Sequence, residues 1–180
     1  ELYLEFHRGT LTSQAKNKRN NRKSEFLYEK AELLSVMDSL LLSGDYPKAL
    51  FDKNWKRILT NQFHDILPGS SIHQVYEDSD REYAEILSDG NAVADGKLGE
   101  LVAAAKRNSD SVVVFNDTGV DGRDDIVSVE GSIYVKDIPS QASQGKTWFA
   151  AKGVPSKGWK SFELSDKNID AEPTLKLENG

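Results

Sequence analysis

A histidine and an aspartate stand next to each other at His64 and Asp65, after an apolar run and before a Pro-Gly dipeptide and two serines. An imidazole beside a carboxylate is a common combination in metal sites and in acid–base catalysis. If both residues end a helix, their side chains diverge by about 100°. That divergence disfavours joint chelation of one ion, so one residue can bind a metal while the other faces a substrate.

A self-contained zinc site cannot be assembled from the histidine spacing. A catalytic zinc ion takes three protein ligands and keeps one open position. The chain has three histidines, His7, His64 and His73, and no cysteine, so a metal must use His, Asp, Glu or backbone oxygen. The sequence therefore predicts a partial site completed from elsewhere. The alternative for each histidine is a structural or solvent-exposed role.

The first helix expected to position the pair starts at an N-cap of Thr12 or Ser13 and ends near Leu42. Its first half is basic between Lys16 and Lys23, which predicts a solvated face or a face that docks on an acidic neighbour. No aromatic residues interleave with these charges, which disfavours nucleic acid. Its second half has an apolar stripe that should face the core. The amphipathic half begins at Phe26, and the stripe comprises Leu27, Leu33, Leu34, Met37, Leu40 and Leu41.

Two further helices should follow. The second is expected from Pro47 to Pro68-Gly69, and the third from a cap at Ser70 or Ser71 to about Arg107, with a bend or break near Gly90. Short connections predict an antiparallel three-helix bundle. The stripe of the second helix comprises Leu50, Phe51, Trp55, Ile58, Leu59 and Phe63.

The composition changes near Ser109, where a domain boundary is expected. Alternating and β-branched runs predict strands over residues 111–115, 126–129, 133–135, 147–151 and 159–164. The predicted fold class is therefore α+β, an antiparallel three-helix bundle followed by part of an antiparallel β-sandwich-like domain.

Composition limits the partners. The net charge is −6, and no apolar run approaches the length of a membrane span, so neither nucleic acid nor a membrane is expected as a partner. The chain opens at Glu1 inside a hydrophobic run, so we expect it to be excised from a longer protein. An oligomer is compatible with these observations.

Three stretches resemble the glycoside hydrolase family 38 α-mannosidases of bacterial or cytosolic type. Residues 1–10 look like the end of the family's catalytic barrel, and residues 55–80, with Asn-Gln-Phe-His-Asp-Ile-Leu-Pro-Gly-Ser-Ser, are similar to its middle helical domain. Parts of residues 112–159 resemble the first strands of its C-terminal β region. The implied domains are 1–11, 12–108 and 109–180.

The resemblance implies roles for three residues. His64 would ligate Zn²⁺, Asp65 would contact the mannoside or oligosaccharide substrate, and Arg8 would lie close to the substrate. The family's nucleophilic aspartate and its other zinc ligands precede this chain, and no general acid can be assigned on it. The implied parent reaction is retaining hydrolysis of α-mannosides, and the isolated chain is expected to be inactive.

Two departures from the family pattern refine this expectation. Asn116-Asp117-Thr118-Gly119 stands where many relatives have Asn-Pro-Leu, which predicts a differently shaped loop. Phe63 stands where Golgi and lysosomal relatives have a histidine, which places the chain in the branch expected in the cytoplasm. Two other readings remain open, a helical interaction module using the basic face, and a carbohydrate-binding β domain using Trp148 or Trp159.

Overall fold

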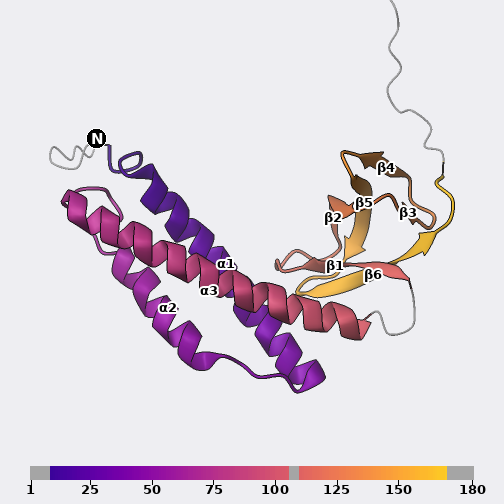
Figure 1. Cartoon of the computed structure of the whole chain (residues 1–180), viewed down its shortest axis with the longest axis horizontal. Coiled ribbons are helices and arrows are strands. Elements are labelled where there is room, and N and C mark those ends of the chain that lie inside the picture. The colour runs from indigo at the N-terminus through magenta and orange to yellow at the C-terminus, as the bar shows by residue number, and fades with distance from the viewer. Residues whose placement is uncertain (1–8, 106–109, 170–180) are drawn as a thin grey trace, which may run out of the picture. The chain divides into compact units, whose positions relative to one another are not determined.

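The computed structural model describes residues 9–105 and 110–169. Three helices, α1 (Ala15–Leu42), α2 (Lys48–Asn61) and α3 (His73–Ala105), precede the strands (Figure 1). The strands are β1 (Ser111–Asn116), β2 (Arg123–Glu130), β3 (Tyr134–Val135), β4 (Ser140–Ser143), β5 (Lys146–Val154) and β6 (Gly158–Ser165). The predicted α+β class is confirmed. The chain divides into two compact units, Glu1–Leu101 and Val102–Gly180.

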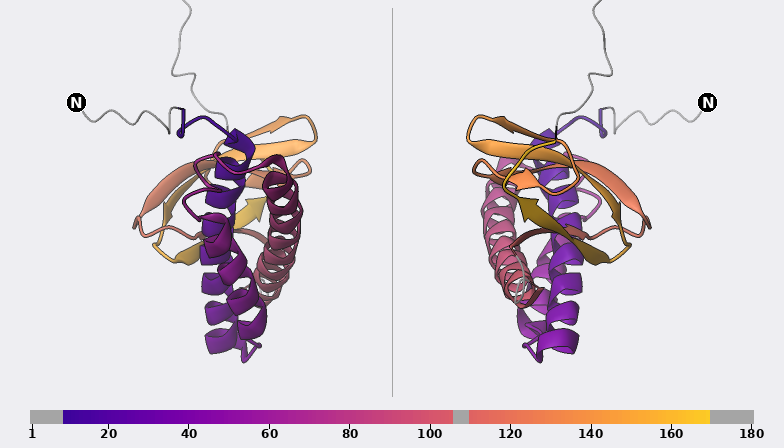
Figure 2. Two further views of the ribbon diagram at one scale, coloured as in Figure 1. Left: turned by 90° about the vertical axis from the view of Figure 1, so that its left-hand side faces the viewer. Right: turned by 90° about the vertical axis from the view of Figure 1, so that its right-hand side faces the viewer.

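In the helical unit α1 and α3 run in the same direction and α2 runs against both. Near the starts of α1 and α3, Ser79 Oγ donates a hydrogen bond to Asn17 Oδ1 at 2.9 Å. Near their ends, Lys97 Nζ contacts Asp38 Oδ2 at 2.7 Å. The views in Figure 2 show the helices alongside one another. None of the helices in the described ranges is both long and apolar enough to cross a membrane.

The buried face of α1 differs from the apolar stripe predicted for it. Leu40 is 79% exposed and Leu41 is 56% exposed, whereas the first half of α1 buries polar side chains. The buried face consists of Asn17, Asn20, Asn21, Ser24, Tyr28, Ala31, Leu34, Ser35 and Asp38. Of the stripe predicted for α2, Phe51 and Ile58 are buried, but Leu59 and Phe63 are exposed. Asn17, Asn21 and Asp38 have hydrogen-bond partners on α3, and these bonds offset the cost of their desolvation.

The predicted helix ends also need correction. Gln14, at φ 50°, precedes α1 and makes no side-chain cap bond, while Thr12 Oγ1 donates to Gly9 O instead. α2 ends at Asn61 and residues 62–69 form turns, so the segment containing His64 is not helical. Ser71 donates its hydroxyl to Asp65 O at 2.6 Å rather than capping α3. The two serines stabilise the turn and not the helix.

α3 continues through Gly90 without a break in its helical assignment. A Cβ at this position would lie 2.8 Å from both Leu27 Cδ2 and Tyr28 Cε2. Gly90 therefore permits the close approach of α1 and α3. The expected break does not occur, because this glycine serves the close packing of α1 and α3 and does not end the helix.

The β unit has two antiparallel three-stranded sheets, ordered β1-β6-β3 and β2-β5-β4. Their shared core contains Phe149, which meets Phe162 edge to face at 5.5 Å between ring centroids. The other buried members are Val135, Ala151 and Val154. The sequence pattern did not predict β4, because this edge strand, Ser-Gln-Ala-Ser, lacks apolar alternation.

Candidate metal and substrate site in the turn between α2 and α3

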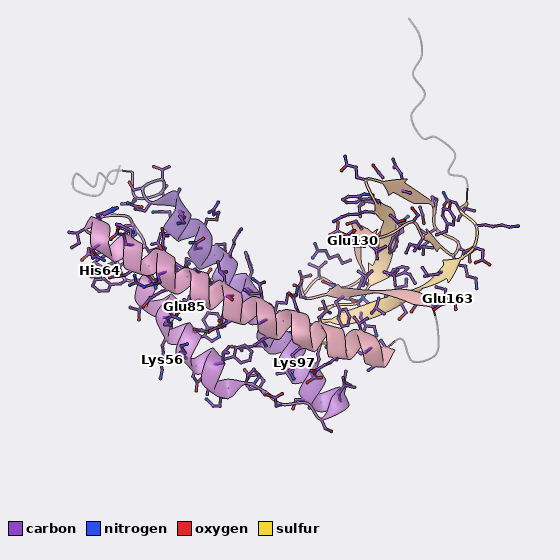
Figure 3. The ribbon with its side chains drawn as sticks, in the orientation of Figure 1. Lys56, His64, Glu85, Lys97, Glu130 and Glu163 are labelled. Carbon is purple, nitrogen blue, oxygen red and sulfur yellow. The ribbon has the colours of Figure 1, made fainter. Side chains whose placement is uncertain are left out.

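His64 and Asp65 lie on the surface of the turn that follows α2, at one end of the helical unit (Figure 3). Their side chains are 77% and 52% exposed, and His64 Nε2 stands 3.7 Å from Asp65 Oδ2. This separation is longer than a hydrogen bond. The Phe63 ring packs against the imidazole with 4.1 Å between centroids. Both functional groups are therefore open to an incoming ligand.

The backbone of this turn is anchored although its side chains are exposed. Asp65 O accepts a hydrogen bond from Ser71 Oγ at 2.6 Å. Ile66 O accepts from the Tyr76 hydroxyl at 3.1 Å and from Asn17 Nδ2 at 3.3 Å. Asn17 of α1 and Tyr76 of α3 thus both hold Ile66 O, and Ser71 holds the preceding carbonyl group, which fixes the chain next to His64.

Lys18 on α1 adds a charged anchor. Its ammonium donates to Leu67 O at 2.8 Å and to Pro68 O at 3.3 Å, and it also contacts Ser13 O. Partial burial lowers the pKa of Lys18, because water is excluded from around the ammonium. The carbonyl oxygens replace that water. Lys18 therefore ties the turn to the beginning of α1.

Gly69 is needed where the turn passes α1. Its φ of +101° lies in the region that favours glycine, and an added Cβ would stand 2.7 Å from Ser13 Cβ. The Pro-Gly dipeptide that signalled a helix end from sequence therefore has a second role. It lets the turn approach the start of α1 closely enough for Lys18 to reach its carbonyl groups.

A layer of amide hydrogen bonds joins the start of the turn to α1 and α3. Asn21 Oδ1 accepts from Gln62 Nε2 at 3.0 Å and from the Tyr83 hydroxyl at 3.2 Å. Gln62 also donates to Glu25 Oε1 at 2.9 Å. Burial raises the pKa of Tyr83, so this hydroxyl stays a proton donor. Sequence reasoning missed this layer; its signal is polar residues at Asn17, Asn20, Asn21 and Ser24, spaced three and four apart.

The basic half of α1 makes contacts within the helical unit. Lys16 pairs with Asp80 at 2.6 Å, Arg22 pairs with Glu25 at 2.7 Å, and Lys18 anchors the turn. These contacts reduce the charge that the face would present to a partner, and they weaken the reading of the chain as an interaction module.

The arrangement can offer one imidazole ligand and one neighbouring carboxylate. Among the described residues, no three His, Cys, Asp or Glu side chains come together in a group that could hold a metal ion. The side chain of His73 is 87% exposed and lies 3.3 Å from Glu77. His7 and Arg8 lie outside the described residues. His64 therefore suits the role of one ligand in a metal site whose remaining ligands are supplied by other parts of a protein.

Comparisons with known proteins match the helical unit to alpha-mannosidases. A family model described as the alpha mannosidase middle domain matches residues 5–101. Alpha-mannosidase 2C1 of Homo sapiens is 39% identical over 105 residues, which are 57% of this chain and 10% of the relative. An alpha-mannosidase of Saccharomyces cerevisiae is 46% identical over 79 residues, 43% of this chain and 7% of the relative. The chain thus spans about a tenth or less of these curated relatives.

Solved structures extend the likeness to the β unit at the level of fold. A glycosyl hydrolase family 38 protein from Enterococcus faecalis superposes with a TM-score of 0.70 over 93% of this chain and 26% of its own length. The sequence identity is 20%, so this match supports the fold alone. The predicted resemblance to family 38 α-mannosidases is confirmed.

Proposed function

This chain belongs to the alpha mannosidase middle-domain family, and from that membership we propose that it is part of a zinc-dependent retaining α-mannosidase. The parent enzyme would hydrolyse α-mannosides. His64 would supply one zinc ligand and Asp65 would contact the sugar. The observation that carries this proposal is the combination of two exposed functional groups with a backbone held by hydrogen bonds from two helices.

The chemistry of the turn suits these roles. Zinc accepts neutral imidazole nitrogen, and a bound zinc ion acts as a Lewis acid toward oxygen atoms of a substrate. His64 Nε2 makes no hydrogen bond to Asp65 at 3.7 Å, so the carboxylate does not compete for that nitrogen. Asp65 can accept hydrogen bonds from sugar hydroxyls. The anchored carbonyl groups limit the movement of both residues when a ligand binds.

The rest of the site would come from other parts of the parent. We propose that residues 1–11 end the catalytic domain, that residues 12–108 form the middle domain, and that residues 109–180 begin the C-terminal β region. Arg8 would then lie beside the substrate. The nucleophilic aspartate and the other zinc ligands would lie in the catalytic domain, and the isolated chain would not hydrolyse an aryl α-mannoside. A cytoplasmic location follows from Phe63, which the cytosolic-type branch shares.

Zinc content of the full-length parent tests the proposal. We expect His64→Ala to lower bound zinc well below about one ion per protein, since a catalytic zinc has few protein ligands to spare. His73→Ala is the matched control, because this histidine is also exposed and also stands beside a carboxylate. Zinc content that is equal in both variants and in the parent would show that His64 is not a ligand.

Asp65→Asn separates the two roles. The amide should leave zinc content unchanged and raise KM for an aryl α-mannoside, because an interaction with bound sugar is weakened while the metal stays. Loss of zinc in this variant would instead assign Asp65 to the metal.

A further inference from the structure

One tryptophan of the β unit faces outward and has no aromatic neighbour in ring contact among the described residues. Trp148 lies on β5 and is 43% exposed, whereas the next residue, Phe149, is 2% exposed in the core. This alternation is the ordinary period of a strand. Trp159 differs, because its ring meets Phe115 at 5.7 Å. Of the two tryptophans in the β unit, Trp148 therefore offers the more accessible ring.

Polar, uncharged side chains flank Trp148 on both neighbouring strands. Ser128 of β2 and Gln141 of β4 are its direct cross-strand partners, so all three side chains lie on one face of the sheet. Figure 1 shows β4 and β2 on either side of β5. Within the described part of the chain, neither side chain takes part in a hydrogen bond. Their hydroxyl and amide groups are thus available to a ligand.

A hollow lies beside the indole. The next cross-strand pair is Ile126 and Ala150, and the small Ala150 side chain leaves space next to the larger Trp148. The resulting cavity measures about 350 Å³ and is also lined by Gln141, Asn168 and Ile169. Ligand pockets typically have about this volume or more, an apolar lining and a few polar groups.

The side chains that line the cavity indicate which kind of ligand it can bind. All side chains around this cavity are uncharged. A nearby cavity of about 430 Å³ is instead lined by Asp137, Lys152 and Lys160 and would suit a charged ligand. An exposed indole with a hydroxyl on one side and an amide on the other matches a molecule with an apolar C–H face and a rim of hydroxyl groups. A pyranose ring has this form.

We propose that the face around Trp148 binds one pyranose unit of an oligosaccharide, with the sugar ring stacked on the indole and its hydroxyls bonded to Gln141 and Ser128. This is a second sugar site on the β unit, formed from residues other than those of the His64 turn. The inference rests on the proposed function only for the identity of the sugar as a mannoside. The site would hold a part of the substrate that is not being cleaved.

Titration calorimetry of the full-length parent with a thio-linked α-mannobiose, which glycosidases do not cleave, tests the site. We expect two binding sites in the unmodified protein and loss of one in Trp148→Ala, with affinity at that site lowered about tenfold or more. Gln141→Ala should weaken the same site. Lys160→Ala in the charged cavity is the matched control and should leave both sites unchanged.

Two results would overturn the inference. Unchanged binding in Trp148→Ala would remove the indole from any sugar site. Equal iodide quenching of tryptophan fluorescence in the parent and in Trp148→Phe would show that another part of the protein covers this face. Failure of the proposed function gives a different result, because His64→Ala would then leave the zinc content and the number of sugar sites unchanged, while Trp148→Ala still removed one site.

Discussion

The two ends of the helical unit are held together by different chemistry. At the end that presents His64, neutral amides and backbone carbonyl groups join α1, α3 and the turn. Towards the other end, the Lys97 ammonium contacts Asp38 at 2.7 Å, Asp45 at 3.1 Å and Glu100 at 3.4 Å (Figure 3). The two kinds of contact have different effects. Neutral side chains and the Lys18 ammonium position the exposed residues by hydrogen bonds to the turn, whereas an ion pair fixes α1 against α3 far from it.

Removing the charged contact should have the largest effect. In Lys97→Ala the Asp38 carboxylate, whose side chain is 1% exposed, loses its cation, and we expect the free energy of unfolding to fall by about 3–5 kcal/mol. The contact with Asp38 raises the pKa of Lys97, which also indicates that the pair favours the charged ammonium. Urea unfolding followed by far-ultraviolet circular dichroism, which reports the helices, measures the change.

The control is Lys48→Ala, because Lys48 forms an exposed pair with Asp52 on α2. Its unfolding midpoint should barely move. The double variant Lys97→Met with Asp38→Leu should recover most of the lost stability, since it removes both buried charges. Equal destabilisation by Lys97→Ala and Lys48→Ala would contradict the contrast between the two ends.

Between the two ends, Tyr28 should make stability depend on alkaline pH. Its hydroxyl donates to Ile86 O at 2.9 Å, and burial raises its pKa from 10.0 to about 12. Below pH 10 the tyrosine is neutral in both states. As pH rises from 10 to 12, the unfolded chain releases this proton and the folded one does not, so about 3 kcal/mol of stability is lost.

Tyr28→Phe tests this dependence, because phenylalanine keeps the ring and removes the proton. The variant should lose stability less steeply than the unmodified chain above pH 10. Measurement of the same variant at about pH 8 gives the cost of the lost hydrogen bond alone, about 1 kcal/mol. Parallel pH profiles for the two proteins would show that Tyr28 ionises as readily in the fold as in the unfolded chain.

The sequence predicted the elements of the helical unit better than the faces they bury. The helix pattern and the breaks after Leu42 and near Pro68 placed three helices correctly in order, because local propensity and turn residues decide those features. The face predicted to be buried on α1 was wrong, since Leu40 and Leu41 are exposed while Asn17 and Asn21 are buried. Burial of amides depends on partners distant in sequence, and a single helix pattern contains no information about them.

The candidate site shows the same limit. His64 and Asp65 were identified from local sequence, and their roles remain predictions. The groups that hold the turn were not identified, because Asn17 and Lys18 are far from His64 in sequence and Tyr76 lies on the next helix. The helical geometry assumed for the pair was also wrong, since α2 ends at Asn61. Pro68 and Gly69 end a turn that passes close to α1, a tertiary contact that the dipeptide alone cannot reveal.

A smaller and more local effect than that of Lys97→Ala is expected at the end that presents His64. Lys18→Met keeps the apolar stem and removes hydrogen bonds to Leu67 O and Pro68 O, so the free energy of unfolding should fall by about 1–2 kcal/mol. The loss should be concentrated in the turn. Amide hydrogen exchange should therefore accelerate between residues 62 and 72 and stay unchanged around Lys97.

Lys16→Met is the matched control, because it lies one half-turn away on α1 and its ion pair with Asp80 is largely exposed. If the hydrogen bonds to the carbonyl groups of the turn position His64, Lys18→Met should also weaken zinc binding by the full-length parent, while Lys16→Met should not. Equal exchange rates in the turn for the two variants would show that Asn17 and Tyr76 suffice to hold it. In that case the positioning of His64 would depend on neutral hydrogen bonds alone, and the contrast with the Lys97 end would become sharper.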